Sequence, residues 1–548
     1  MKQKGAKIII DCLLEQGVEY VFGYPGGTIL DIFDELYKAS DKLPLILTSH
    51  EQGAAHAADG YARASGKVGV VLATSGPGAT NLVTGIANAY MDSVPMVAIT
   101  GNVPLALLGR DSFQEVDITG ITMPITKHNY IVKDVKDLAG TMREAFYIAS
   151  SGRPGPVLVD IPKNIQQEEC EFKTQKPKEF VSVLDTKQDG IVKALEILKV
   201  AKKPIMYIGG GAINASAELQ EFIQKFDIPA ANSIMGSGVI PYDNPLSLGL
   251  IGMHGHAGAN KSLINSDTII AVGTRFSDRV ATNRLKFGEN KNIIHIDIDF
   301  AEIDKNVMSN CYIKGDAKQI IKYLTANAKE IKHTDWVKEC KDFVLNSPFK
   351  TVSSPLCPRE ILKELRAQTP DNQIVATDVG QHQMWTAQSF GCKQPRSLIT
   401  SGGLGTMGYG LGAANGAAFA RKENAVLITG DGSYHMNLNE TVTASKYNLP
   451  VKIFLFNNSA LGMVRQWQTL FYEKRYSSTN LTLPTNYEKL AEAFGVRYFE
   501  LTKDSDIKAT VKAALAHKGT VLVNCKINPE GVVLPMVPAG QPTSNMIE

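Results

Sequence analysis

The chain lacks an excess of either charge, and it lacks long apolar runs. Lysine and arginine total 57 and aspartate and glutamate total 55 in 548 residues, so the formal net charge is +2. This balance gives no reason to expect nucleic acid, an anionic membrane or another polyanion as a partner. No stretch approaches the roughly 18–20 apolar residues of a membrane span. We therefore expect a soluble protein without a secretory signal.

Cysteines are few and widely spaced. There are seven of them, an odd number, and no two have the spacing C-x-x-C. This distribution gives no sign of a disulfide framework. We expect reduced thiols, as in a cytoplasmic protein.

Short runs rich in valine and isoleucine recur along the chain, and a helical pattern follows each of them. Runs that are apolar on both faces and alternate with helices are typical of parallel sheets in α/β domains. The length is enough for roughly three or four such domains. The predicted strands are 68–73, 94–100, 157–161, 205–208, 268–272, 293–298, 374–377, 425–429, 451–456 and 520–525.

Two polar stretches that contain proline, Gln166–Lys187 and Asn346–Pro358, interrupt this alternation. The segment 531–548 contains three prolines and two glycines, so the sequence also predicts an irregular tail there, which becomes ordered when something docks on it. The three units that the polar stretches separate are 1–165, 188–345 and 358–530.

The most specific motif lies in the third unit. The strand 425–429 ends in Gly430-Asp431-Gly432-Ser433, a helical pattern runs from Met436 to Tyr447, and the strand 451–456 ends in Asn457-Asn458. Parallel sheets bind ligands at the carboxyl ends of their strands, so the side chains of Asp431 and Asn458 should reach one point.

Oxygen ligands of this kind suit Mg²⁺, which shares its coordination shell with phosphates and water. Glycines beside Asp431 let backbone N–H groups approach a phosphate, and the helix that follows directs its N-terminus at it. The alternative for Gly-Asp-Gly is an ordinary strand-to-helix turn with an aspartate N-cap. The position of Asn457-Asn458 favours the metal site.

This pattern resembles the signature of the thiamine diphosphate enzymes, in which Asn-Asn follows Gly-Asp-Gly at this distance. The resemblance implies that Asp431 and Asn458 bind Mg²⁺ through their side chains and Ala460 through its main-chain oxygen. The ion would neutralise the diphosphate of the cofactor, beside Gly430, Gly432 and Ser433.

The resemblance also implies a glutamate from the first domain of a neighbouring subunit. Glu51 fits, because it follows the strand-like Leu45–Thr48 and opens a helical segment. A carboxyl group that faces N1′ of the aminopyrimidine shuttles a proton and makes the 4′-nitrogen a base against C2 of the thiazolium. The alternative is a glutamate that merely favours the positive end of a helix.

Further segments resemble one family closely, the large catalytic subunit of acetohydroxyacid synthase, also called acetolactate synthase. The match runs from about residue 5 to 540. The segments that carry it are 21–27 (VFGYPGG), 50–53 (HEQG), 74–81 (TSGPGATN), 109–115 (GRDSFQE), 152–156 (GRPGP), 405–410 (GTMGYG), 462–467 (GMVRQW) and Phe471-Tyr472.

The resemblance implies three α/β domains, each with a doubly wound parallel sheet, which bind the pyrimidine, FAD and the diphosphate in chain order. It implies that pyruvate is decarboxylated on thiamine diphosphate. The hydroxyethyl unit then joins a second pyruvate or 2-oxobutyrate, giving acetolactate or acetohydroxybutyrate for branched-chain amino acid biosynthesis. It also implies a homodimer or a dimer of dimers with active sites at the subunit interface, and a possible small regulatory subunit.

Several residues take roles by the same resemblance. Met407 supports the bent cofactor beside Gly405, and Met463 approaches the same pocket. A large flat side chain such as Trp467 can contact the extra methylene of 2-oxobutyrate, and Arg279 can bind the acceptor carboxylate. The alternatives are core packing for the methionines and Trp467, and a surface ion pair for Arg279. The residues that would line the reacting centre from the first domain are Gly27, Phe113, Gln114 and Lys163.

The middle unit matches the positions at which anabolic members of the family bind FAD. Gly209-Gly210-Gly211 directly follows the strand 205–208, although the spacing G-x-G-x-x-G is absent. Two positions depart from the family, since Ser277 replaces a usual aspartate and Phe300 a usual proline. The other matching positions are Arg153, Met253, His254, Gly255, Gly273, Arg275, Arg279, Asp297, Asp316 and Ala317.

Two other classes of protein stay open as alternatives. One is a related thiamine enzyme, such as a flavin-dependent pyruvate oxidase or another 2-oxoacid decarboxylase or carboligase. The other is a nucleotide-binding or regulatory α/β protein without catalysis. Glu51 disfavours the second alternative, because a binding module has no need of a proton relay.

Overall fold

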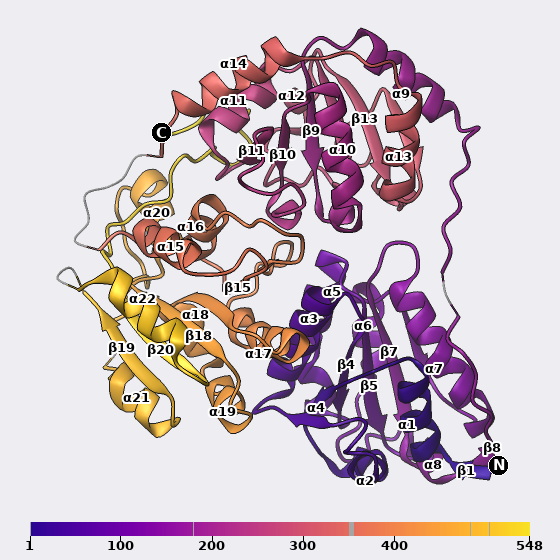
Figure 1. The fold of residues 1–548 in the computed structure, drawn as a ribbon. Helices are drawn as coiled ribbons and strands as arrows, with labels where there is room; N and C mark the ends of the chain where they lie inside the picture. Colours follow the sequence, from indigo (N-terminus) through magenta and orange to yellow (C-terminus); the bar gives the residue numbers. More distant parts are fainter. Residues whose placement is uncertain (1, 179, 350–355, 483, 503–504) are drawn as a thin grey trace.

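The computed structural model describes residues 2–178, 180–349, 356–482, 484–502 and 505–548. Its three six-stranded sheets are parallel throughout (Figure 1). Successive residues of a strand pack into two different apolar clusters, one on each face: Val70 and Leu72 in one, Val71 and Ala73 in the other. Both faces of the sheet are therefore buried, as expected for a doubly wound α/β domain.

The first sheet has the order β3-β2-β4-β5-β7-β6. A short antiparallel pair, β1 (Lys2–Lys4) with β8 (Glu169–Glu171), joins the two ends of this domain. The strands of the sheet are β2 (Val21–Gly23), β3 (Leu45–Leu47), β4 (Gly69–Ala73), β5 (Met96–Asn102), β6 (His128–Ile131) and β7 (Pro156–Pro162). The helices are α1 (Gly5–Glu15), α2 (Leu30–Lys38), α3 (Glu51–Ser65), α4 (Pro77–Asn81), α5 (Val83–Asp92), α6 (Ile118–Thr122), α7 (Val135–Ser150) and α8 (Lys163–Gln167).

The central sheet has the order β11-β10-β9-β12-β13-β14, which is the order of the dinucleotide-binding fold. Its strands are β9 (Pro204–Ile208), β10 (Ala230–Asn232), β11 (Ser247–Leu250), β12 (Thr268–Val272), β13 (Asn292–Asp297) and β14 (Cys311–Lys314). Its helices are α9 (Asp189–Val200), α10 (Ser216–Phe226), α11 (Ala257–Asn265), α12 (Arg284–Phe287), α13 (Ala317–Asn327) and α14 (Thr334–Leu345).

The third sheet has the order β16-β15-β17-β18-β20-β19, which repeats the connectivity of the first sheet. Its strands are β15 (Ile374–Thr377), β16 (Leu398–Ile399), β17 (Ala425–Gly430), β18 (Val451–Asn457), β19 (Arg497–Leu501) and β20 (Val521–Lys526). Its helices are α15 (Pro358–Ala367), α16 (Gln381–Ser389), α17 (Tyr409–Arg421), α18 (Asp431–Asn437), α19 (Glu440–Lys446), α20 (Gly462–Phe471), α21 (Tyr487–Ala493) and α22 (Ile507–Ala516).

The predicted strands are all present, and their ends differ from the prediction by two residues at most. The helix predicted over 436–447 is wrong in its bounds. Helix α18 begins at Asp431, and a break at Leu438–Asn439 separates it from α19. The polar Gly-Asp-Gly motif is itself the first turn of this helix, which a search for apolar periodicity does not detect. Ser353–Pro355 of the second polar stretch lie outside the described residues.

The first and third domains pack against each other through α3 and α17, which lie side by side in Figure 1. This packing depends on glycine, because a Cβ at Gly60 would lie 2.1 Å from the carbonyl oxygen of Ala413. Likewise, a Cβ at Gly416 would lie 1.9 Å from the carbonyl oxygen of Ala57. The two helix backbones therefore approach closely and bring α3, with Glu51 at its start, against the third domain.

The tail after β20 contains no helix or strand in its described residues, as predicted, and it is docked rather than free. The amide of Val537 donates to the carbonyl of Met253 at 2.8 Å, and Thr282 donates to the carbonyl of Gln541. The side chain of Gln466 on α20 both donates to and accepts from the backbone of Val533. The tail thus joins the third domain to the central domain.

All seven cysteines are free thiols, as predicted. Among the described residues, no helix combines the length and the apolar character needed to cross a membrane.

Candidate active site

Asp431 lies at the end of β17 and is 2% exposed. Its carboxylate accepts from the amide of Gly432 at 3.1 Å, and the amides of Ser459 and Ala460, which donate to Asn457 and Asn458, also favour its charged form. Burial raises the pKa of Asp431 to about 6, and these backbone donors oppose the rise. The side chain of Asn458 lies beside it, since its Oδ1 accepts from the amide of Ala460 at 3.1 Å. The structure therefore brings the three predicted metal ligands together.

Two side chains that the sequence analysis did not single out face this point. Gln381 and His382 begin α16, directly after β15 and Gly380. The imidazole of His382 is buried, and its Nε2 has no hydrogen-bond partner among the described residues. Burial lowers its pKa to about 3, so the ring is neutral. An unpartnered buried nitrogen beside Asp431 is a place for a ligand.

A signal for these residues was present in the sequence. Strand β15 lies next to β17 in the sheet, and the order of strands reverses there, at the point where open α/β sheets bind ligands. The residues after the predicted strand 374–377 are Asp378-Val379-Gly380-Gln381-His382, a polar segment at a strand end. Only the order of strands in the sheet identifies the end of β15, rather than another strand end, as part of the site.

Met407 lies on the loop that joins β16 to α17. Its terminal methyl group would be 3.7 Å from a Cβ on Gly432, so the loop reaches the Asp431 motif. The buried carboxylate of Asp378 accepts from the amides of Gly408 and Gly410 and holds the end of this loop. Gly405 is exposed and has a φ of 72°, which favours glycine.

Helix α20 supplies the apolar wall of the site. Met463 and Trp467 are half-buried and line the cavity, and Met463 also packs against the apolar core of the third domain. The ring of Trp467 packs against Phe471 with centroids 5.2 Å apart. Trp467 therefore combines packing on its own helix with a face toward the cavity.

One cavity of about 1710 Å³ connects the third domain with the central domain. Its lining includes residues at the strand ends of both sheets. The predicted residues that line it are Arg153, Gly209, Gly210, Gly211, Met253, His254, Gly273, Arg275, Arg279, Asp297, Asp316, Ala317, Gly405, Met407, Gly430, Asp431, Gly432, Ser433, Asn458, Ala460, Met463 and Trp467.

The glycines of the central domain have a packing role of their own. A Cβ on Gly209 would lie 2.1 Å from the carbonyl oxygen of Gly273, and one on Gly211 would lie 2.8 Å from its Cα. The turn after β9 therefore packs directly on the turn after β12. Gly255 does not line the cavity, and a Cβ there would meet the backbone of Ile251 at 2.6 Å.

Polar groups of the central domain point into the cavity without full partners. His254 is half-buried, its Nε2 is shielded from solvent without a partner among the described residues, and burial lowers its pKa to about 4. Burial raises the pKa of Asp297, at the end of β13, to about 6. Asp316 caps α13 by accepting from the amide of Gln319. These groups line the end of the cavity that is made by β13 and α13.

Arg279 lies at an exposed part of the cavity wall. Its side chain is 61% exposed and forms a 3.4 Å ion pair with Asp278, as the alternative for this residue predicted. Its other nitrogen lies 3.2 Å from the sulfur of Met253. Ser277 lines the cavity, whereas Phe300 packs on Tyr312 and does not.

The predicted residues of the first domain form a separate group. The carboxylate of Glu51 accepts from the side-chain amide of Asn81 at 3.0 Å, and Lys163 donates to the carbonyl of Gly27 at 3.1 Å. Phe113 is 87% exposed, and Gln114 has a φ of 59°. None of these five predicted residues lines the cavity that contains Asp431. Within one chain, the structure does not bring Glu51 and Asp431 to a common pocket.

Comparison with protein families gives a consistent division of the chain. Three family models match, described as the N-terminal TPP binding domain, the central domain and the C-terminal TPP binding domain of thiamine pyrophosphate enzymes. They match residues 3–121, 191–324 and 378–525, respectively.

Curated relatives match over nearly the whole chain. A probable acetolactate synthase large subunit of Methanocaldococcus jannaschii is 44% identical and covers 100% of this chain and 95% of its own length. An acetolactate synthase of Arthrospira platensis is 44% identical, over 99% of this chain and 97% of the relative. The isozyme 1 large subunit of Escherichia coli is 42% identical, with the same shares. The chain therefore belongs to the acetolactate synthase large-subunit family of thiamine diphosphate enzymes.

Proposed function

We propose that this chain decarboxylates pyruvate on thiamine diphosphate and transfers the hydroxyethyl unit to a second 2-oxoacid. Pyruvate as acceptor gives 2-acetolactate, and 2-oxobutyrate gives 2-aceto-2-hydroxybutyrate, the carbon skeletons of branched-chain amino acids. The observation that carries the proposal is the full-length identity of 42–44% to acetolactate synthases, together with the cluster of Asp431, Asn458 and Ala460 at neighbouring strand ends.

The residues at these strand ends fit Mg²⁺ and a diphosphate. Asp431 is a buried carboxylate without a lysine or arginine in ion-pair contact among the described residues, so a bound cation would stabilise its charged form. The free Nε2 of His382 suits an oxygen of the diphosphate, and so do the amides around Gly430, Gly432 and Ser433. Asn458 and the main-chain oxygen of Ala460 would complete the protein's share of the metal ligands.

The chemistry of the bound cofactor needs a proton relay and a fixed geometry. Thiamine diphosphate supplies an electron sink for the carbon that loses carbon dioxide. Glu51 would hold a proton against the aminopyrimidine ring, while Gly27, Phe113, Gln114 and Lys163 line the reacting centre. Met407 would support the cofactor beside Gly405, with Met463 across the pocket. Apolar walls exclude water from the reacting carbon.

The choice of acceptor would depend on α20 and the cavity mouth. The half-buried face of Trp467 can contact the methyl end of 2-oxobutyrate, and one methylene in such a pocket is worth roughly 1–3 kcal/mol. The exposed guanidinium of Arg279 can exchange Asp278 for the carboxylate of the acceptor, because both partners are carboxylates.

The central domain fits FAD. The cavity reaches Gly210 and Gly273 at the switch point of a sheet with the dinucleotide-binding order, and His254 has a free nitrogen there. Asp297 ends β13, where an acidic side chain can bind a ribose hydroxyl. The other proposed contacts are Arg153, Gly209, Gly211, Met253, Arg275, Asp316 and Ala317, and Gly255 would serve indirectly, in the turn that carries His254.

A second copy of the chain would complete the active site. The separation of Glu51 from the Asp431 cavity and the exposure of Phe113 support a homodimer or a dimer of dimers in which each site uses two chains. The E. coli relative is named a large subunit, which supports a small partner subunit here. Free thiols support a cytoplasmic location. We assign the three functional units to 1–165, 188–345 and 358–530.

The test is a product assay with thiamine diphosphate, Mg²⁺, FAD, pyruvate and 2-oxobutyrate, carried out without oxygen. We expect both hydroxyacids, and omission of 2-oxobutyrate should leave acetolactate alone. A protein that forms neither product, or that in a parallel aerobic assay consumes oxygen with pyruvate and releases only a two-carbon product, would instead be an oxidase or a plain decarboxylase.

A further inference from the structure

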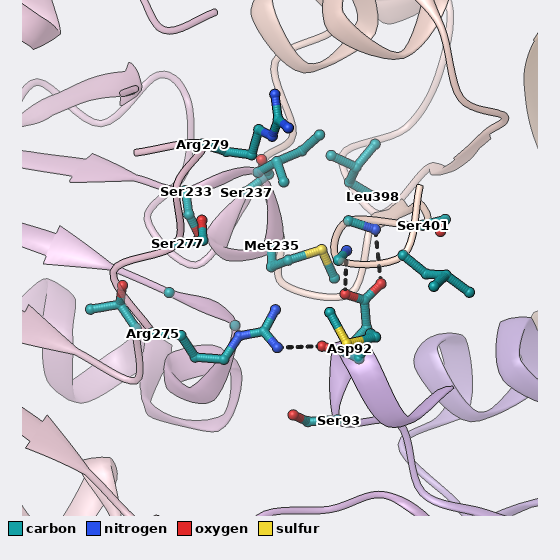
Figure 2. A pocket seen from close by; sticks show the side chains of 18 of the residues that line it. Asp92, Ser93, Ser233, Met235, Ser237, Arg275, Ser277, Arg279, Leu398 and Ser401 are labelled. Carbon is teal, nitrogen blue, oxygen red and sulfur yellow. Dashed lines mark hydrogen bonds between the residues drawn. The ribbon is translucent and has the colours of Figure 1, made fainter. Parts of the chain in front are cut away.

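The end of helix α5 lies where all three domains meet. The residues Met91, Asp92 and Ser93 come from the first domain and line the cavity together with residues of the central and third domains (Figure 2). Ser93 has a φ of 59°, which is rare for a serine, so this turn is held in shape by its surroundings.

Asp92 directs its carboxylate at the loop that precedes α17. One oxygen accepts from the amide of Gly403 at 2.7 Å, and the other accepts from the amide of Gly402 at 2.8 Å, as Figure 2 shows. The side chain of Asp92 is 0% exposed. A buried carboxylate with two charge-assisted bonds to consecutive amides fixes the loop backbone closely.

A buried cation makes this arrangement possible. The guanidinium of Arg63 bonds Asp92 at 3.0 Å and Asp59 at 2.6 Å. Burial lowers the pKa of Arg63, but Asp59, Tyr409 and Asp92 raise it more, so it stays well above its ordinary value. Arg63 therefore remains charged and supplies a counter-charge beside the carboxylate of Asp92.

The rest of the loop is tied to the same helices of the first domain. Ser401 donates to the side-chain oxygen of Asn88 at 2.5 Å and accepts from the amide of Thr406 at 2.9 Å. At the far end, the hydroxyl of Tyr409 donates to Asp59 at 2.5 Å. Met407 lies between Thr406 and Tyr409, so its place depends on these ties.

One neighbour of Asp92, Met91, contacts the central domain, and the other, Ser93, bonds an arginine of the first domain that itself pairs with the central domain. The carbonyl of Met91 accepts from the guanidinium of Arg275, and the hydroxyl of Ser93 accepts from Arg153 at 2.8 Å. Arg153 also pairs with Glu302 at 2.6 Å, so it has support without Ser93. By contrast, the amides of Gly402 and Gly403, in the loop of Met407, donate to Asp92 and to no other group among the described residues.

We propose that Asp92 is a positioning residue for the thiamine diphosphate site: by holding Gly402 and Gly403 it sets the loop that places Met407 against the cofactor. The proposal rests on the proposed function, because it assigns Met407 to the cofactor. Asparagine at this position would direct one N–H group at an amide N–H, and a buried donor without an acceptor costs about 1–3 kcal/mol.

The test compares Asp92→Asn with a matched control, Asp267→Asn. Asp267 also accepts from two consecutive amides, those of Lys202 and Lys203, at 2.8 and 3.0 Å, but at one oxygen, so asparagine can keep both bonds there. It does not line the cavity and therefore controls for the loss of a carboxylate charge. Thiamine diphosphate affinity is measured in the presence of Mg²⁺ by the quenching of intrinsic fluorescence, FAD affinity by flavin absorbance, and kcat and KM for pyruvate at saturating cofactor.

We expect Asp92→Asn to raise the Kd for thiamine diphosphate about tenfold, corresponding to ~1.4 kcal/mol. We expect kcat to stay reduced at saturating cofactor, because Met407 remains displaced, while the Kd for FAD and the KM for pyruvate change little. Asp267→Asn should leave both cofactor affinities at the wild-type values.

A second variant perturbs the same contact from the loop side. A Cβ on Gly403 would lie 2.9 Å from the carboxylate oxygen of Asp92 and 3.1 Å from the Cβ of Met91. We expect Gly403→Ala to weaken thiamine diphosphate binding in the same direction, even where Asp92→Asn fails to fold.

Wild-type thiamine diphosphate affinity and kcat in Asp92→Asn would overturn the proposal, as would the same result in Gly403→Ala if that variant alone folds. An equal loss of thiamine diphosphate and FAD binding would also overturn it, since general unfolding affects both. These outcomes are separate from failure of the proposed function, which would appear as absence of acetolactate from the wild-type protein.

Discussion

The region around Asp431 and the region around Asp92 are each built on a buried aspartate that accepts bonds from backbone amides. At Asp92 the protein supplies the counter-charge itself, through Arg63 at 3.0 Å. At Asp431 the described residues supply no ion pair, and burial raises the pKa to about 6. A buried carboxylate that lacks a cation is costly, so the protein stabilises one region by itself and leaves the other to a ligand.

The two regions also differ in how the polar groups around the aspartate are bonded. The neighbours of Asp431 include a second group without a partner, the Nε2 of His382. The neighbours of Asp92 are bonded to each other in a closed set that includes Asp59 and Tyr409. Unpaired buried groups gather where a charged ligand would bind.

The largest effect on activity is expected from Glu51→Gln. Glu51 belongs to neither the Asp431 region nor the Asp92 region, so this variant tests the rest of the proposed site. The side-chain amide keeps the contact with Asn81 but cannot relay a proton, so we expect acetolactate formation to fall by about 10³-fold. Thiamine diphosphate affinity should stay near the wild-type value. Exchange of the C2 proton of the bound cofactor, followed by NMR, measures the step directly, and unchanged exchange would remove Glu51 from this role.

Replacing Asp431 with alanine removes the buried carboxylate that has no protein cation, and so tests whether a ligand supplies the counter-charge there. Without this carboxylate the metal loses its only charged protein ligand, and we expect the Kd for thiamine diphosphate with Mg²⁺ to rise about 100-fold or more. FAD absorbance should be retained, which serves as the folding control. Titration with the cofactor at several Mg²⁺ concentrations checks this, and retained Mg²⁺-dependent affinity would contradict the metal site.

Glu440 sharpens the comparison, because it is a buried carboxylate without an ion pair among the described residues and yet it has a structural role. It accepts from the amides of Ser49 and His50, directly before Glu51, and from the hydroxyl of Thr443. Burial raises its pKa from 4.5 to about 7, although these donors oppose the rise. The folded protein therefore binds this proton more tightly than the unfolded chain does.

The sign of the pH effect follows from this raised pKa. The contribution of Glu440 to stability is full below pH 4.5, decreases as the pH rises to about 7, and is constant above that. Glutamine stays neutral, so Glu440→Gln should be more stable than wild type at pH 8 by about 3 kcal/mol and equal to it at pH 4.5. Denaturant unfolding of both proteins at several pH values measures the difference, and a pH-independent difference would contradict the assignment.

The smallest effect is expected at Trp467. Leucine removes the flat surface that faces the cavity and leaves the metal and cofactor contacts in place. We expect the preference for 2-oxobutyrate over pyruvate to fall by about tenfold at most, since a single methylene contact is worth roughly 1–3 kcal/mol. The ratio of the two hydroxyacid products in a mixed-substrate assay measures this, with Phe471→Leu as a neighbouring control. An unaltered ratio would remove Trp467 from acceptor selection.

Local patterns predicted much of the fold and the centre of the site. Strands such as 268–272 and 374–377 were placed at their observed bounds, because an apolar run with helices on each side is a local signal. Asp431 and Asn458 were assigned together, because each follows a strand directly. The start of α18 at Asp431 was missed, since a polar first turn has no apolar period.

Other parts of the site have no local signal. His382 belongs to the site because β15 lies beside β17 in the sheet, which the sequence does not show. Its Nε2 lacks a partner because residues distant in sequence bury the ring. The turn after β9 contains three glycines, but two of them are required by the close approach of the backbone of Gly273, in the turn after β12.

The amino-acid sequence by itself determined the three parallel sheets, the polar strand ends that attract a metal and a diphosphate, and the family of the chain. Those properties depend on residues close together along the chain, where strand ends and periodicity are visible. Only the tertiary structure decided which carboxylates have a cation of their own. Asp92 meets Gly402, and Glu440 meets His50, because α3 and α5 pack against the third domain, and such contacts arise from domain packing rather than from any nearby pattern.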